Sequence, residues 1–168
     1  MGTRCVIRIG GYQIYRHSDG YPEGVISDLY LFSRNYSRSP LEDPEYFLAN
    51  FIFYCKLSFW LTDINFRDCK GWEYTYGVCS SRCRHDDLDY IYEFDKDGRL
   101  RIYEFDYDGE EAVKREIFRG TLLQAYLEFC LNSPYKDGCH LNVKVFNIPK
   151  SIIESINKSI EVLGEVTV

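Results

Sequence analysis

The sequence predicts an α+β fold in which an antiparallel sheet of hairpins carries helices packed on one face. Strand-like segments occur in neighbouring pairs joined by short turns, at 4–16 and 88–105. Helix-like segments lie between or after these pairs instead of alternating with single strands, which argues against a doubly wound parallel sheet. The length of 168 residues suits one domain, so we expect a single globular domain over 1–168.

The first predicted hairpin is followed by a helix. Apolar side chains alternate over 4–9, the glycines at 10–11 supply a two-residue turn, and 12–16 returns as the second strand. Pro22 then suits the first turn of a helix with one apolar face. The residues at 35–40 break this helix.

A long apolar helix is predicted next. Asp43-Pro44-Glu45 combines a capping acceptor, a proline at the first helical position and a carboxylate near the positive end of the helix dipole. The helix continues to about Leu61, and its apolar stretch is too short and too interrupted to cross a bilayer. We expect 63–86 to be mostly loop, with a short strand at 73–79.

The second hairpin joins strands at 88–94 and 99–105 through the turn Asp95-Lys96-Asp97-Gly98. The next segment, 111–118, reads as a further strand, although 112–114 also suits a helix.

Three further elements complete the predicted order. Thr121 and Gln124 form a capping box that starts a helix at 122–131. A strand is expected at 141–146 and a helix with one apolar stripe at 152–163.

The cysteines and the N-terminal residues favour a cytoplasmic protein. Seven cysteines is an odd number and they are scattered, so a complete disulfide framework is not expected. Whether Cys130 and Cys139 pair with each other stays open. The first thirty residues contain arginines and no apolar run of signal-peptide length.

Acidic residues are concentrated in one segment. The net charge is −6 for the whole chain and −8 for 86–111. Such a segment repels phosphate backbones, which disfavours nucleic-acid binding there and favours a protein partner with a basic surface. The same segment contains several tyrosines, which anchor protein interfaces at low entropic cost. The predicted partner-binding residues are Asp87, Asp89, Tyr90, Tyr92, Tyr103 and Asp106, and Tyr107 belongs to the same predicted aromatic face unless the helices cover it.

Titratable residues also gather between the first hairpin and the first helix, in Tyr15-Arg16-His17-Ser18-Asp19-Gly20-Tyr21-Pro22-Glu23-Gly24. If the strand continued, His17 and Asp19 would project to the same side and share a proton or a metal. A metal-assisted hydrolase or nuclease needs a third group, and our candidate catalytic set adds Arg16 and Glu23. Asp28 or His85 could supply this group instead. Turn chemistry alone also explains Asp19-Gly20, and we favour that interpretation.

A zinc site is a weaker hypothesis. Cys69, Cys79, Cys83 and His85 have suitable donors, but their spacing fits no usual zinc motif, so we interpret the cysteines as buried or loop thiols and predict no metal. The chain contains no P-loop, HExxH helix or GxSxG elbow, and we expect no cofactor.

The motif at 15–24, together with the opening Met1-Gly2-Thr3-Arg4, resembles a group of small uncharacterised proteins from phages, archaeal viruses and prokaryotes. The likeness extends through 43–50 and 87–92. It implies a mobile-element setting, in the host cytoplasm if the protein is viral, and carries no activity that could be transferred. Our leading hypothesis is therefore a non-enzymatic protein-interaction function for the acidic, tyrosine-rich hairpin, and the hydrolase is the alternative. The sequence leaves the oligomeric state open.

Overall fold

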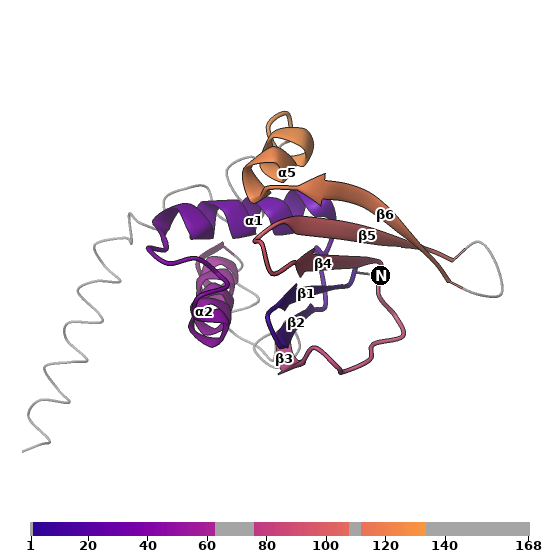
Figure 1. Cartoon of the computed structure of the whole chain (residues 1–168), viewed down its shortest axis with the longest axis horizontal. Coiled ribbons are helices and arrows are strands. Elements are labelled where there is room, and N and C mark those ends of the chain that lie inside the picture. Colours follow the sequence, from indigo (N-terminus) through magenta and orange to yellow (C-terminus); the bar gives the residue numbers. More distant parts are fainter. Residues whose placement is uncertain (1, 63–75, 108–111, 134–168) are drawn as a thin grey trace, which may run out of the picture.

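The computed structural model describes residues 2–62, 76–107 and 112–133. They form a six-stranded sheet in the order β3-β2-β1-β4-β5-β6, with three helices, which confirms the predicted α+β class (Figure 1). The elements are β1 (Cys5–Ile9), β2 (Tyr12–Arg16), α1 (Pro22–Asn35), α2 (Pro44–Thr62), β3 (Tyr76–Ser80), β4 (Tyr90–Phe94), β5 (Leu100–Asp106), β6 (Val113–Gly120) and α5 (Leu122–Phe129).

Local signals predicted most of these elements. Both hairpins form, and the ambiguous segment after the second one is a strand, β6, paired antiparallel with β5. The capping box at the start of α5 is complete, because Thr121 and Gln124 each accept a hydrogen bond from the other's backbone N–H. The predicted strand at 141–146 and helix at 152–163 lie outside the described residues.

Strand β1 lies in the middle of the sheet and has two different neighbours. It pairs antiparallel with β2 and parallel with β4, which is the one parallel pair among the described strands. A parallel pair needs a long connection, and here the chain passes through β2, α1, α2 and the edge strand β3 before it returns as β4. The pairing therefore joins the start of the chain to a segment some eighty-five residues later, with Arg4 and Asp89 in direct contact.

The helices pack on one face of the sheet, here called the helix face (Figure 1). The strands place alternate residues on it, and α1 and α2 contribute buried aliphatic and aromatic side chains. Phe47 and Phe51 of α2 stack with ring centroids 6.2 Å apart, and Phe32 of α1 contacts both rings. This core fixes the helices against the strands.

The opposite face of the sheet, here called the second face, carries a smaller apolar cluster. Val6, Leu88 and Ile91 are buried there, and the half-buried rings of Tyr15, Tyr103 and Phe105 pack around them. No helix among the described residues is both long enough and apolar enough to cross a membrane.

Candidate functional site

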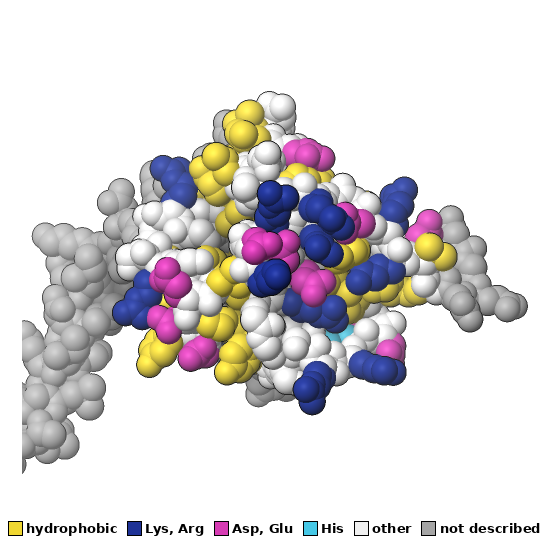
Figure 2. All heavy atoms as spheres, viewed as in Figure 1, with side chains coloured by type: hydrophobic (Ala, Val, Ile, Leu, Met, Phe, Trp, Pro, Cys, Tyr) yellow, Lys and Arg dark blue, Asp and Glu magenta, His cyan; other side chains and the backbone are white. Residues whose placement is uncertain are grey.

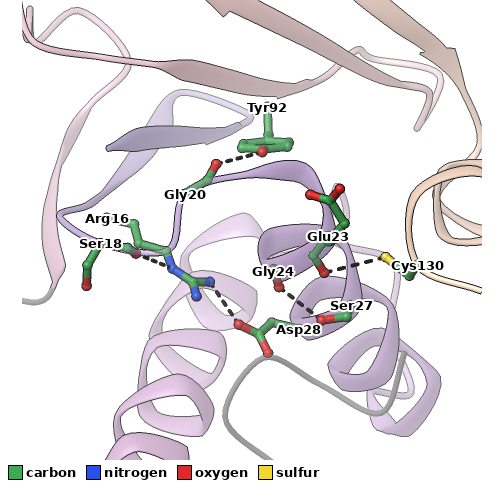
Figure 3. Close-up of polar contacts among 9 residues, drawn as sticks. All are labelled: Arg16, Ser18, Gly20, Glu23, Gly24, Ser27, Asp28, Tyr92 and Cys130. Carbon is green, nitrogen blue, oxygen red and sulfur yellow. Dashed lines mark hydrogen bonds and ion pairs between the residues drawn. The ribbon is translucent and has the colours of Figure 1, made fainter. Parts of the chain in front are cut away.

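The segment 15–24 links the sheet to α1 through a buried ion pair. Arg16 is fully buried on the helix face, where its Nη1 donates to the Asp28 carboxylate of α1 over 2.8 Å (Figure 3). Its Nε donates to the main-chain oxygen of Ser18 over 2.9 Å. Arg16 is therefore engaged in holding the strand to the helix, and no part of it is exposed to a substrate.

Gly20 packs closely against the residues at the start of β1. Its N–H donates to the Thr3 oxygen over 2.9 Å, and its oxygen accepts the Tyr92 hydroxyl over 2.7 Å (Figure 3). A Cβ added at this position would approach the Thr3 oxygen to 2.9 Å and the Cys5 Cβ to 3.0 Å. The glycine is thus required by close packing.

The four residues of the candidate catalytic set do not come together. Strand β2 ends at Arg16 and Asp19 has a φ of 54°, so the extended backbone that would align His17 with Asp19 is broken. His17 is exposed, and its Nδ1 lies 3.3 Å from the Tyr15 hydroxyl on the second face. Glu23 lies in the first turn of α1. The geometry fits the turn interpretation of this segment.

The acidic segment is spread over separate places in the fold. The Asp95 carboxylate accepts the backbone N–H groups of Asp97 and Arg99 and so closes the hairpin turn. The Glu104 carboxylate pairs with Arg115 over 2.6 Å. Figure 2 shows Lys and Arg side chains interleaved with Asp and Glu side chains over the strands, so no continuous acidic surface is visible on that side.

One part of this segment does line a hollow. Asp86, Asp87 and Asp89 surround it together with Gly2, Thr3, Arg4 and Tyr107, and its volume is about 410 Å³. The N–H of Arg4 donates to the Asp89 carboxylate over 2.7 Å, and its guanidinium pairs with Asp87 over 2.8 Å. Three carboxylates therefore meet a single guanidinium in this lining, which leaves an excess of negative charge. We call this feature the acidic hollow.

The pKa of the phenol of Tyr107, which lines the hollow, is affected by this charge. Partial burial and then the charges of Asp89, Asp87 and Asp86 raise the pKa of Tyr107 above its usual value. The Tyr107 hydroxyl donates to the Leu88 oxygen, which holds the ring beside the hollow. A negative potential that disfavours a phenolate favours a cation in the same place.

No protein-family model matches this chain, and no curated protein or solved structure matches it either.

The predicted tyrosine face is divided between the two sides of the sheet. Tyr90 and Tyr92 of β4 point to the helix face, where Tyr92 is fully buried. Tyr103 of β5 lies opposite Ile91 and is on the second face. The physical reason is the hairpin register, which pairs Tyr103 with Ile91 instead of with Tyr90 or Tyr92. Neighbouring residues of a strand point to opposite faces, so a difference of one position places the side chain on the other face. The prediction of one aromatic face was wrong.

The remaining predicted partner residue is Asp106, at the exposed end of β5. Of the predicted partner-binding residues, only Asp87 and Asp89 line the acidic hollow. The sequence reasoning missed Arg4 and Tyr107 as members of the hollow. Arg4 reaches it only through the parallel pairing of β1 with β4, for which no local sequence signal exists.

Three of the four weak zinc candidates lie close together. Cys79 Sγ is 3.9 Å from the Nε2 of His85, and Cys83 Sγ lies 4.0 Å from the Oγ of Ser80, the residue next to Cys79. Cys69 lies outside the described residues, as does Cys139, while Cys130 is a buried free thiol. Among the described residues, no three cysteine, histidine or acidic side chains are placed to hold one metal ion.

Proposed function

We propose that this protein is a non-enzymatic binding protein whose acidic hollow receives a lysine or arginine side chain from a basic segment of a protein partner. The observation that carries the proposal is the lining of the hollow, in which Asp86, Asp87 and Asp89 face the guanidinium of Arg4 alone. A second cation of a partner would balance the excess charge.

The residues around the hollow have distinct roles in this proposal. Asp86 is exposed and forms no ion pair with any of the described residues, so it is the first carboxylate that an incoming cation meets. Asp87 is bound to Arg4 and also accepts the Tyr15 hydroxyl over 3.4 Å, which fixes its position. The ring of Tyr107, which is half exposed, offers an aromatic surface for the aliphatic stem or the charge of the side chain.

Location and origin belong to the same proposal. We place the protein in the cytoplasm, or in the host cytoplasm if it is viral, where small acidic proteins often bind host factors. Support comes from the resemblance of its N-terminal motifs to phage and archaeal-virus proteins. The hydrolase alternative receives no support from the described geometry, because Arg16 is buried on the helix face while His17 lies exposed beyond the other side of β2.

The test compares two variants that change the net charge equally. In one, Asp86, Asp87 and Asp89 are replaced by asparagine. In the control, three exposed carboxylates outside the hollow are neutralised: Glu42→Gln, Asp97→Asn and Glu128→Gln. A fluorescent arginine- and lysine-rich peptide is titrated with each protein at low and at physiological salt, and its anisotropy gives the Kd.

We expect the hollow variant to weaken peptide binding at least about tenfold, which corresponds to about 1.4 kcal/mol. The control should weaken it by much less at physiological salt, because exposed charges far from the peptide are screened there. Equal losses in the two variants, or no binding by the wild type, would overturn the proposal.

A further inference from the structure

The turn after the edge strand β3 brings two cysteines together. The N–H of Cys83 donates to the Ser80 oxygen over 3.0 Å, which closes the turn. The N–H of Ser81 donates to the Gly11 oxygen over 2.9 Å and so attaches the turn to the first hairpin. Cys79, the residue before the turn, thus faces the segment that contains Cys83.

A buried glutamine side chain hydrogen-bonds to both cysteine residues. Gln13 of β2 is fully buried, and its Nε2 donates to Cys79 Sγ over 3.3 Å and to the Cys83 main-chain oxygen over 3.0 Å. Its Oε1 accepts the Nε of Arg8 over 3.1 Å, which fixes the amide orientation. One side chain therefore positions the sulfur of one cysteine and the backbone of the other.

The two sulfurs differ from the other described thiols in access and in contacts. Cys5, Cys55 and Cys130 are buried, whereas Cys79 and Cys83 are partly exposed, and Cys83 Sγ lies 4.0 Å from the Oγ of Ser80, the residue next to Cys79. The Nε2 of His85 lies 3.9 Å from Cys79 Sγ, close enough to accept its proton in the tautomer that leaves this nitrogen free. The His85 ring is itself held by stacking on Tyr15, with centroids 4.5 Å apart.

We propose that Cys79 and Cys83 are a redox-active dithiol that closes to a disulfide by exchange with a low-molecular-weight disulfide such as oxidised glutathione. The proposal is independent of the acidic hollow and of its partner. It rests on the turn that brings the two cysteines together, on the hydrogen bonds of Gln13 to both residues and on the neighbouring imidazole.

The exchange takes place in two steps. Cys83 loses its proton to water, and its thiolate attacks one sulfur of the small disulfide, which releases one small thiolate and leaves a mixed disulfide on Cys83. Cys79 then gives its proton to His85, and its thiolate attacks the Cys83 sulfur and releases the second small thiolate. The small thiolates take up the two protons, so the protein loses two electrons and two protons and the small disulfide gains them.

The order of attack follows from the surroundings of the sulfurs. Burial raises the pKa of Cys79 above its usual value. Cys79 is therefore a poor first nucleophile, but it directly precedes the turn that ends at Cys83 and is positioned there for the second step. Cys83 is the residue that attacks the external disulfide.

The test equilibrates the full-length protein in glutathione buffers of stepwise ratio, followed by acid quenching, alkylation and peptide mapping. Trypsin cuts after Arg82 and Arg84, so it separates Cys79 from Cys83 and leaves their peptides joined only when the disulfide has formed. We expect this linked pair to appear as the buffer becomes oxidising, while Cys5, Cys55 and Cys130 stay unmodified in the folded protein.

Three variants separate the two steps. Cys79→Ser should stop at the mixed disulfide on Cys83, and Cys83→Ser should react much more slowly at Cys79. Gln13→Met should slow closure of the disulfide more than it slows formation of the mixed disulfide. General unfolding would not produce this difference. Unfolding would also be detected separately, because it would expose Cys5 to alkylation.

Wild-type mapping decides the proposal even if a variant fails to fold. It is overturned if Cys79 and Cys83 are both still alkylated at every glutathione ratio. It is equally overturned if either residue is found joined to Cys69 or Cys139 instead.

Discussion

The Arg16 guanidinium and the Asp28 carboxylate form an ion pair at 2.8 Å with side-chain exposures of only 0% and 4%. The pair connects the end of β2 to the middle of α1 across the helix face (Figure 3). Both charges have been removed from water, so each depends on the other for compensation.

Replacing one member of this pair should be much worse than replacing both. Asp28→Asn keeps the shape and leaves the buried guanidinium without a counter-charge, so we expect a loss of about 3–5 kcal/mol in the free energy of unfolding. The double variant Arg16→Met with Asp28→Leu should lose clearly less. Urea denaturation measures both. Arg119→Met, which breaks the exposed pair with Glu116, is the control and should cost at most about 1 kcal/mol. A cost for Asp28→Asn as small as that of the control would contradict the expectation.

Gly20→Ala should destabilise the protein through overpacking. The new Cβ would meet the Thr3 oxygen, the Arg4 carbonyl carbon and the Cys5 Cβ at 2.9–3.0 Å, and two of these atoms are backbone that cannot rotate away. We expect a cost of about 1–3 kcal/mol. Gly11→Ala is the matched control, because nothing lies within 4 Å of its added Cβ. Equal midpoints of thermal unfolding for the two variants would show that the segment adapts.

Cys5 should make stability fall in alkaline solution. Burial raises the pKa of this thiol from 9.0 to about 12 in the folded protein. Between these pH values the unfolded chain releases the proton and the folded protein keeps it, so the free energy of unfolding decreases as pH rises. Below pH 9 the thiol is protonated in both states and contributes no pH dependence.

The measurement compares wild type with Cys5→Ala by urea denaturation at several pH values. Relative to the variant, the wild type should lose about 1.4 kcal/mol per pH unit above pH 9, for as long as both stay folded. Ile7→Val, on the same strand and without a titratable group, should keep a constant difference from the wild type. Parallel curves for Cys5→Ala and wild type would mean that the thiol ionises equally in both states.

Thr121→Ala should weaken the start of α5. The side chain accepts the Gln124 N–H over 3.2 Å, and this bond has no replacement in an alanine variant. We expect a loss of about 1 kcal/mol in the free energy of unfolding. Thr121→Ser retains the acceptor and should stay close to the wild type, so a similar loss for serine would point to the methyl group instead of the cap.

Short-range signals were sufficient for most elements of the fold. The Gly10-Gly11 turn, Pro44 at the start of α2 and the Thr121–Gln124 capping box each act within a few residues, and each lies at the predicted position. The alternation of β4 and β5 likewise predicted a hairpin. These features depend on backbone geometry and local hydrogen bonds, which the sequence displays directly.

The candidate sites depend on contacts between distant residues, and only the tertiary structure decided them. The parallel pairing of β1 with β4 brings Arg4 to Asp87 and Asp89, and the antiparallel pairing of β2 with β3 brings Gln13 to Cys79. Strand partners and register follow from how the whole apolar surface is buried, and no local pattern encodes them. The sequence by itself thus determined the elements and their chemistry, while the pairing of strands determined which side chains meet.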